Sequence, residues 1–369
     1  MKNILYVGPY RQADVFGEVS REFVNALFKS KFNITIRPAY VSNAQRMVVD
    51  DKFVQAEALL DTYDTVIQHV LPNMFEYFGG LKNIGIMSPE TSNIQYTGWP
   101  NRCNIMDEMW TNSELSKTRL KSSGVKVPIH VISQPSDTVK FTKPYDSILV
   151  TNPPKFLFYY IGAFESRKNI VGLLTAFHRE FHINEPVELV LKFHQPGTNP
   201  HQLMEQVQQQ IRRTKEVLRI YQNPDLYKQE VIITEFMPQE AIYALHNSCH
   251  CFVSASCSES WSIPSFDALG FGKTPIIVDG TGPTAFVNKK NGWVVKSVED
   301  SIINDASPHP TLFTAHEHWN RAHTLSLGAA MRASYQLNTD ERKIKSLIGQ
   351  NEVKNYSYDN IASILNDHN

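Results

Sequence analysis

Short runs of apolar residues alternate with segments of helical period along the whole chain. The first run, Ile4 to Val7, predicts a buried strand, and the apolar residues within Val15–Leu27 recur every four positions, which predicts a helix. Further strands are predicted at residues 65–70, 83–87, 108–111 and 129–132, with a helix at 116–122. Strands that alternate with helices in this way favour a parallel, doubly wound sheet.

The pattern is interrupted near the middle of the chain and then starts again. Prolines and polar residues within 141–155 predict a linker. The second half alternates in the same way, with strands predicted at 156–161, 187–193, 231–234, 251–254 and 275–278, and helices at 169–181, 202–218, 239–245 and from Pro264. The chain is therefore predicted to be an α/β protein of two Rossmann-like doubly wound domains. Such domains bind ligands outside the carboxyl ends of their strands.

Composition narrows the functional classes. A chain of 369 residues exceeds the usual size of one hydrophobic core, which favours two domains. The net charge of −1 gives no reason to expect a nucleic-acid surface, and no window is apolar for long enough to cross a bilayer. The N-terminal apolar run ends at Gly8-Pro9, so it suits a first strand better than a signal peptide. We expect a cytoplasmic protein; peripheral attachment to a membrane and the oligomeric state stay open.

A metal site is the first candidate chemistry to consider. In the second half of the chain, five residues that can bind metals lie close together in the sequence: His246, Cys249, His250, Cys251 and Cys257. This spacing matches no zinc pattern, and Cys251 falls inside a predicted strand. Because free thiols are often buried in protein cores, we interpret the cysteines as core residues and expect no metal.

The segment most typical of a ligand site is 254–279. A strand ends there, a loop carries Glu259, and Pro264 suits the first position of a helix. The unpaired N–H groups of such a first helical turn attract phosphate. A helix that starts near Pro264 would place Asp267 in its first turn, so that both carboxylates could accept hydrogen bonds from the hydroxyls of one ribose or hexose. Taken alone, the segment equally allows a solvated Glu259 and an Asp267 that only complements the helix dipole.

A second segment, 160–169, supplies positive charge. Gly162 permits a turn after a predicted strand, and Arg167 and Lys168 precede the next helix. Two cations in a strand–helix loop would neutralise a diphosphate leaving group. Adjacent basic residues are more often solvated surface charges, so this segment carries little weight by itself.

Together, the two segments resemble the family 4 retaining glycosyltransferases of GT-B fold, the "group 1" transferases. In that family a strand–glycine–lysine loop is followed later by two glutamates with seven residues between them. The resemblance implies two facing Rossmann-like domains, with the acceptor-side domain at 1–140 and the donor domain at 156–345. It also implies a C-terminal helix, at 346–369, that crosses back to the first domain.

The resemblance also implies roles for individual residues. Lys168, assisted by Arg167, would contact the donor diphosphate; Glu259 would hold hydroxyls of the transferred sugar; Asp267 would bind the ribose. The remaining donor-binding positions in this half are Gly162, which matches the family's glycine, and Ser260, Trp261 and Ser262, which match the loop whose backbone amides reach the sugar and phosphate.

Three departures from the family pattern stand out. The second acid is Asp267 rather than glutamate, and Ala163 occupies the position of an arginine that many members have after the glycine. Ser260 and Ser262 replace two loop glycines of the family's Glu-Gly-Phe-Gly string. These departures bear on the roles of individual site residues more than on the resemblance to the family.

The first half fits the same scheme. Gly8 and Gly17 resemble the family's first glycine loop, which approaches the donor phosphates and the acceptor. Glu90, after a predicted strand, and His69, at the end of another, are both candidates to face the acceptor. The sequence does not choose between them.

The resemblance implies transfer of a hexosyl group from a nucleoside diphosphate sugar to a hydroxyl acceptor, with retention at the anomeric carbon. No Asp-x-Asp string stands in a plausible phosphate loop, so we expect a metal-independent reaction with no cofactor besides the sugar nucleotide as co-substrate. The base (UDP, GDP or ADP) stays open, as does the acceptor: a saccharide, lipid, protein or modified nucleobase.

Two other functions stay open. One is a nucleotide-sugar epimerase of related fold, and the other is a catalytically silent nucleotide-sugar-binding or scaffold subunit. A dehydrogenase is disfavoured because no G-x-G-x-x-G string follows a predicted strand.

Overall fold

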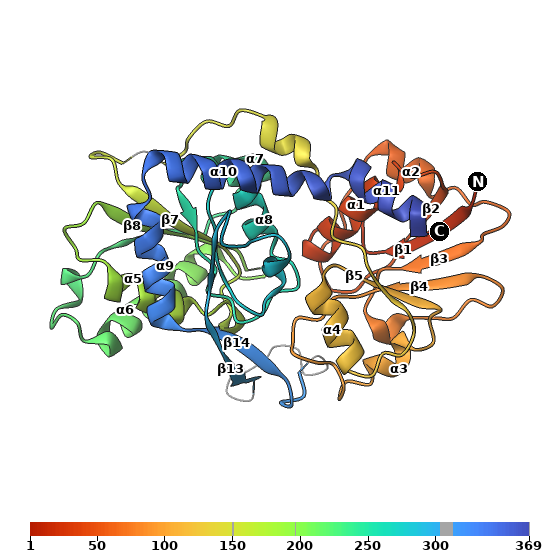
Figure 1. Ribbon diagram of the computed structural model, residues 1–369, viewed down its shortest axis with the longest axis horizontal. Coiled ribbons are helices and arrows are strands. Elements are labelled where there is room, and N and C mark those ends of the chain that lie inside the picture. Colours follow the sequence, from red (N-terminus) through yellow and green to blue (C-terminus); the bar gives the residue numbers. More distant parts are fainter. Residues whose placement is uncertain (150, 196, 303–312, 369) are drawn as a thin grey trace. The chain divides into compact units, whose positions relative to one another are not determined.

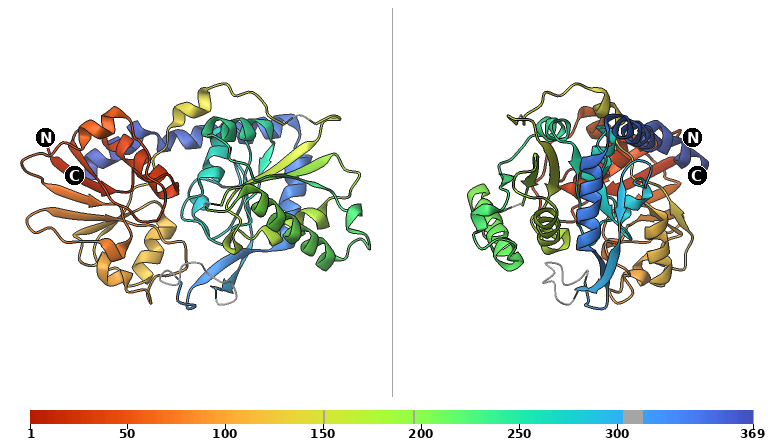
Figure 2. Two further views of the ribbon diagram at one scale, coloured as in Figure 1. Left: turned by 180° about the vertical axis from the view of Figure 1, so that it is seen from behind. Right: turned by 60° about the vertical axis from the view of Figure 1, so that its left-hand side comes forward.

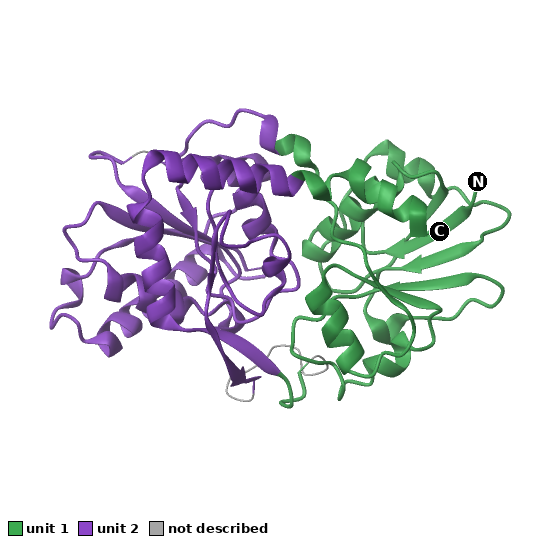
Figure 3. Cartoon of the chain, viewed as in Figure 1, with its two compact units in different colours: residues 1–140, 309–317, 354–369 green, residues 141–308, 318–353 purple. Residues whose placement is uncertain are grey.

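The computed structural model describes residues 1–149, 151–195, 197–302 and 313–368. It divides into two compact units, each built from separate stretches of chain (Figure 3). Unit 1 comprises Met1–Lys140, His309–Glu317 and Lys354–Asn369, and unit 2 comprises Phe141–Pro308 and His318–Val353. The predicted linker, 141–155, lies at the start of unit 2, and its residue 150 is outside the described residues.

Unit 1 is built on a parallel sheet. In its described residues the strand order is β2-β1-β3-β4-β5-β6, and the strands are β1 (Asn3–Gly8), β2 (Asn33–Pro38), β3 (Thr65–Gln68), β4 (Lys82–Ile86), β5 (Glu108–Thr111) and β6 (Ile129–Val131). The helices of this unit are α1 (Val15–Leu27), α2 (Asp51–Ala56), α3 (Trp99–Cys103), α4 (Glu114–Ser122) and α11 (Tyr358–His368). Because all five pairings are parallel, the carboxyl ends of the strands share one edge.

The last helix completes the core of unit 1. Ile361 and Leu365 of α11 are buried in one cluster with Ile4 and Phe23. The helix predicted at 346–369 is not continuous: α10 (Thr339–Val353) ends in unit 2, and α11 begins only at Tyr358. Between them the Tyr356 carbonyl accepts a hydrogen bond from Ser136 N–H at 2.9 Å, so the backbone pairs with another segment where helical bonds would have continued.

Unit 2 contains a second parallel sheet, of order β10-β7-β8-β9 among the described residues, which comprises β7 (Phe156–Gly162), β8 (Val187–Phe193), β9 (Glu230–Ile233) and β10 (Cys251–Phe252). A parallel pair, β11 (Ile276–Val278) and β12 (Trp293–Val295), is joined to it through a single bridge between Val253 and Ile276. The helices are α5 (Ile170–Glu180), α6 (Pro200–Leu218), α7 (Gln239–Ser248), α8 (Ile263–Gly270), α9 (Thr324–Gln336) and α10. An antiparallel hairpin of β13 (Ser297–Ser301) and β14 (His318–Ala322) extends from this unit in all views (Figure 1, Figure 2).

The central strand β7 is apolar because both its faces are covered. Phe158 and Tyr160 are buried in the same cluster as Phe177 of α5, whereas Leu157 and Tyr159 are buried with Ala268 of α8. A parallel strand with helices on both faces has a continuous apolar sequence rather than an alternating one. This is the pattern from which the strand was predicted.

The α/β class with parallel sheets is confirmed. Several predicted elements match the structure to the residue, among them α1, β5 and β8. The sequence pattern did not predict β2, β12 or the β13–β14 hairpin. None of the helices in the described residues has the length and apolar character that crossing a bilayer requires.

Candidate active site

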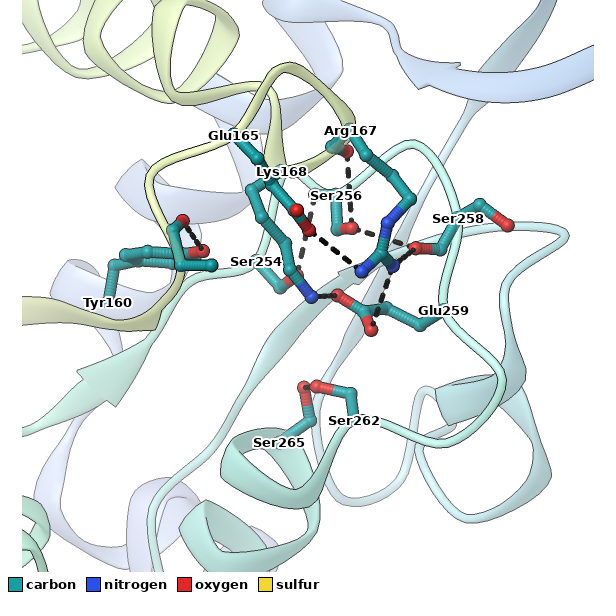
Figure 4. Close-up of polar contacts among 11 residues, drawn as sticks. Tyr160, Glu165, Arg167, Lys168, Ser254, Ser256, Ser258, Glu259, Ser262 and Ser265 are labelled. Atoms are coloured by element: carbon teal, nitrogen blue, oxygen red, sulfur yellow. Dashed lines mark hydrogen bonds and ion pairs between the residues drawn. The ribbon is translucent and has the colours of Figure 1, made fainter. Parts of the chain in front are cut away.

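Two loops of unit 2 meet at the carboxyl ends of neighbouring strands. Lys168 follows β7 in a short 3-10 turn, Ser166–Lys168, and Glu259 lies in the loop between β10 and α8. The strands β7 and β10 are adjacent and parallel, so both loops leave the sheet at the same edge. Figure 4 shows Lys168 and Arg167 converging on the Glu259 carboxylate. Lys168 Nζ lies 2.6 Å from Glu259 Oε1, and Arg167 Nη1 lies 3.4 Å from Oε2.

Arg167 is held on three sides. Its Nη1 donates to the Ser258 carbonyl at 2.6 Å, and its Nη2 donates to Glu165 Oε1 at 2.8 Å, in addition to the contact with Glu259. The guanidinium therefore has less freedom than the Lys168 ammonium to turn toward a ligand. Glu165 also belongs to this cluster, although no sequence motif pointed to it.

The Glu259 carboxylate is ionised at neutral pH. Its side chain is only 9% exposed, and burial alone would raise its pKa. The positive charges of Lys168 and Arg167 outweigh burial and lower the pKa below the ordinary value for glutamate. The site thus holds a buried carboxylate balanced by two cations.

Hydrogen bonds to backbone carbonyl groups join the two loops. Cys257 N–H donates to the Arg167 carbonyl at 2.8 Å, and Asn169 Nδ2 donates to the Ala255 carbonyl at 3.2 Å. Asn169 has a left-handed backbone, with φ 51°, and its side chain caps α5 by accepting from Gly172 N–H. Asparagine tolerates this conformation better than most residues do. The predicted helix, 169–181, included Asn169 as its first residue, whereas the structure makes Asn169 the cap of a helix that begins at Ile170.

Ser262 takes a conformation that favours glycine. Its φ is 70° and its ψ 83°, and it precedes α8, which begins at Ile263. Non-glycine residues in sparsely populated regions cost about 1–3 kcal/mol and occur most often at functional sites. The Ser262 hydroxyl lies 2.8 Å from that of Ser265, and Figure 4 shows this pair on the α8 side of Glu259. A serine thus stands at a position whose backbone conformation favours glycine.

Trp261 anchors the same loop. Its side chain is buried against Phe286, with ring centroids 4.8 Å apart, and against Phe266 at 5.9 Å. Ser260 comes close to another segment, because a Cβ at Gly282 would lie 2.0 Å from the Ser260 carbonyl oxygen. Packing therefore fixes the conformation of the loop.

The placement of Asp267 in the first helical turn is wrong. Since α8 begins one residue earlier than Pro264, Asp267 is its fifth residue, and the first turn holds no acid. The Asp267 side chain is buried. The pKa of Tyr159, a core residue of β7, is raised mainly by burial and also by two nearby cysteines. The charge of Asp267 is a further cause of this increase. The proposed contact with ribose stays a prediction.

Gly162 is required by packing. A Cβ at this position would lie 2.3 Å from the Tyr160 hydroxyl oxygen, which donates to the Ala163 carbonyl. In unit 1, a Cβ at Gly8 would lie 2.7 Å from the Tyr6 ring, and one at Gly17 would lie 2.0 Å from the Gln12 carbonyl oxygen. Close packing explains all three glycines, and their roles toward a donor stay predictions.

The acceptor candidates follow neighbouring strands of unit 1. His69 comes directly after β3, and Glu90 lies half-buried in a bend after β4. Because β3 and β4 are adjacent and parallel, both residues lie on the side of the sheet where these strands end. Burial lowers the pKa of His69 to about 4, so the imidazole is neutral at pH 7. Its Nδ1 lies 2.8 Å from the Tyr6 hydroxyl.

The cysteines are buried and free. Burial raises the pKa of the Cys249 and Cys251 thiols to about 12. His246 Nδ1 lies 2.7 Å from the Tyr159 hydroxyl, and His250 Nδ1 accepts from Leu157 N–H. Within the described ranges, no three His, Cys, Asp or Glu side chains are grouped so that they could hold a metal ion.

Several solved structures have a similar fold. The sucrose-phosphate synthase from Thermosynechococcus elongatus has a TM-score of 0.64 at 11% identity, covering 100% of this chain and 98% of that chain. HepE from Anabaena has a TM-score of 0.66 at 12% identity, covering 100% and 99%. The trehalose-6-phosphate synthase OtsA has a TM-score of 0.67 at 6% identity, covering 100% and 98%. At such identities the likeness establishes a shared fold, the GT-B fold.

The fold and a family match over part of the chain together identify a glycosyltransferase. Residues 143–306, which fall within unit 2 and contain the cluster of Lys168 and Glu259, match the family of glycosyl transferases group 1. No curated protein matches the chain.

Proposed function

We propose that the chain transfers a hexosyl group from a nucleoside diphosphate sugar to a hydroxyl acceptor, with retention at the anomeric carbon and without a metal ion. The observation that carries this proposal is the cluster of Lys168, Arg167 and Glu259 at the carboxyl edge of the unit 2 sheet. A UDP-hexose is the favoured donor, because HepE was solved with UDP-glucose and a trehalose-6-phosphate protein from E. coli with UDP-2-fluoro-glucose. In this proposal unit 2 binds the donor and unit 1 serves the acceptor.

Donor binding would exchange the partners within the cluster. Lys168 donates to Glu259 in the structure, and a diphosphate would compete for the same ammonium. Glu259 would then accept from hydroxyls of the sugar in place of the lysine, because an ionised carboxylate accepts at both oxygens. Arg167, held by Glu165 and the Ser258 carbonyl, keeps a positive charge beside the site throughout.

Charge on the leaving diphosphate would be stabilised by residues of the chain. Lys168 is 15% exposed and Arg167 16% exposed, so both cations act where water screens them little. Electrostatic stabilisation of this kind is usually the largest contribution to catalysis of such a step. The departing phosphate would itself take the acceptor proton, and the neutral His69 is not needed as a base.

The test is the variant Lys168→Ala, with Lys290→Ala, an exposed lysine of unit 2, as the matched control. The donor is first found by the shift in melting temperature with UDP-, GDP- and ADP-sugars, since bound ligands stabilise the folded state. Cleavage of that sugar nucleotide is then measured from the amount of nucleoside diphosphate released. Nuclear magnetic resonance identifies the product and its anomer. We expect Lys168→Ala to lose about two decades in rate, corresponding to about 3 kcal/mol, and Lys290→Ala to lose nothing.

Normal turnover by Lys168→Ala would refute the proposed diphosphate role. An epimerised sugar in place of a glycoside with retained configuration would identify the chain as an epimerase.

We also propose a cytoplasmic location, on the ground that all four thiols are free and buried.

A further inference from the structure

The β13–β14 hairpin is bonded to the candidate active site. Asn320 N–H, in β14, donates to the Cys257 carbonyl at 2.9 Å, two residues before Glu259. Asn320 Nδ2 donates to the Gly280 carbonyl at 2.8 Å, and a Cβ at Gly280 would lie 2.8 Å from that same nitrogen. The strand is therefore fitted closely against the loop that carries Glu259.

The next residue of the strand, Arg321, reaches the other loop. Its Nη1 donates to Asn169 Oδ1 at 3.5 Å, and its Nε donates to Asp300 Oδ2, in β13, at 2.5 Å. Asn169 directly follows Lys168 and has the left-handed backbone at the end of the Lys168 turn. Two neighbouring residues of β14 thus contact the two loops whose charges meet in the site.

The contacts of Asn169 fix the orientation of its amide group. Its Oδ1 accepts from Gly172 N–H and from Arg321, and its Nδ2 donates to the Ala255 carbonyl. Rotating the amide by half a turn would place Nδ2 against two donors and Oδ1 against a carbonyl oxygen. Because Arg321 carries a positive charge, it opposes that rotation more strongly than a neutral donor would.

We propose that Arg321 is a positioning residue for glycosyl transfer: through Asn169 it holds the left-handed turn that directs Lys168 toward Glu259 and the donor diphosphate. This inference rests on the proposed function, because it assigns to Lys168 the role of contacting the diphosphate. Arg321 itself contacts no reacting atom in this scheme.

A simpler role for Arg321 would be to pair the two hairpin strands. Its ion pair with Asp300 joins side chains that are 38% and 37% exposed, and exposed pairs of this kind contribute little. This alternative predicts that Arg321→Ala and Asp300→Asn have the same effect. Positioning through Asn169 predicts that only Arg321→Ala disturbs the site.

The experiment measures donor cleavage and ligand affinity in Arg321→Ala, Asp300→Asn and Asn169→Gly. The binding probes are UDP and uridine, measured by calorimetry. We expect Arg321→Ala to lower kcat on the order of tenfold, since small errors in placing a catalytic group are costly. It should weaken UDP binding but leave uridine binding unchanged, because only UDP carries the diphosphate that Lys168 contacts. Asp300→Asn should behave as wild type in all three measurements.

A double-mutant cycle tests the route through Asn169. Asn169→Gly keeps the left-handed turn accessible but removes the amide. In that background, Arg321→Ala should have no further effect on kcat, since coupled residues are non-additive. Additive losses, or an Asp300→Asn variant as impaired as Arg321→Ala, would overturn the proposal. So would an Arg321→Ala variant with wild-type kcat and UDP affinity.

Thermal unfolding of each variant excludes loss of fold as the cause. Arg321→Lys keeps a cation and should recover part of the UDP affinity that Arg321→Ala loses. If Lys168→Ala retains full turnover, the proposed function itself is wrong. If Lys168→Ala is impaired and Arg321→Ala is not, only the positioning role is wrong.

Discussion

Lys168 Nζ and Glu259 Oε1 lie 2.6 Å apart although 91 positions separate the two residues in the chain. Both side chains are largely buried, so this pair is less screened by water than a surface ion pair. Loss of either residue is therefore expected to impair the same step. The roles of the two acids, Glu259 and Asp267, should be distinguishable by steady-state kinetics.

Glu259→Gln and Asp267→Asn should impair different steps. A contact to the transferred sugar orients the bond being broken, so Glu259→Gln should lower mainly kcat. A ribose contact is made about equally in the ground and transition states, so Asp267→Asn should raise mainly KM. The increase should correspond to a loss of roughly 1–3 kcal/mol in binding free energy. Calorimetry with the bare nucleoside diphosphate should show weaker binding for Asp267→Asn alone. Equal binding by both variants and wild type would restrict Asp267 to a role in the core beside Tyr159.

Activity should survive chelation of metal ions. The positive charge facing the diphosphate is supplied by Lys168 and Arg167 in the proposed mechanism. Turnover of the sugar nucleotide after dialysis against EDTA should match that of an untreated sample. A dead sample that recovers with Mn²⁺ or Mg²⁺ would contradict this prediction.

Folding stability should depend on the charge of Glu259. Its pKa is lower in the folded protein than the ordinary value of about 4.3, so ionisation stabilises the fold at pH values above that ordinary pKa. The stabilisation should be lost as the pH falls from about 4.3 toward the lower folded pKa. Urea denaturation of wild type and Glu259→Gln should therefore show a difference in unfolding free energy at pH 7 that shrinks in acid. A difference that grows in acid would show that the carboxylate is destabilised by its surroundings.

Ser262 should tolerate glycine better than alanine. Alanine loses the hydrogen bond to Ser265 and keeps the left-handed backbone, whereas glycine loses the same bond and removes the strain. We expect Ser262→Gly to be about 1 kcal/mol more stable than Ser262→Ala in chemical denaturation. Equal stability of the two variants would mean that the loop relaxes without cost.

The fold was predictable wherever a local pattern decided the structure. The apolar run of β7 and the four-residue period of α1 depend on burial by neighbouring layers, and both match the structure. The hairpin was not predictable, because β13 is mostly polar, has no fully buried residue and contains no apolar run. Its pairing depends on contacts with Cys257 and Gly280, which lie far away in the sequence.

The site was predictable in its charges but not in its geometry. Lys168 and Glu259 could be paired only through the family resemblance, because no local rule brings two distant loops together. The start of α8 at Ile263, one residue before the predicted start, was enough to remove Asp267 from the first turn. The left-handed backbone of Ser262 was hidden because serine gives no signal for a conformation that glycine usually marks.

The position of α11 has a consequence for how the protein is made. Ile361 and Leu365 complete the core that begins with Ile4, so the first unit in the sequence needs the last helix in the sequence. On the ribosome, domains generally fold in the order in which they emerge. Unit 1 can therefore complete its core only after α11 has been synthesised and has left the ribosome.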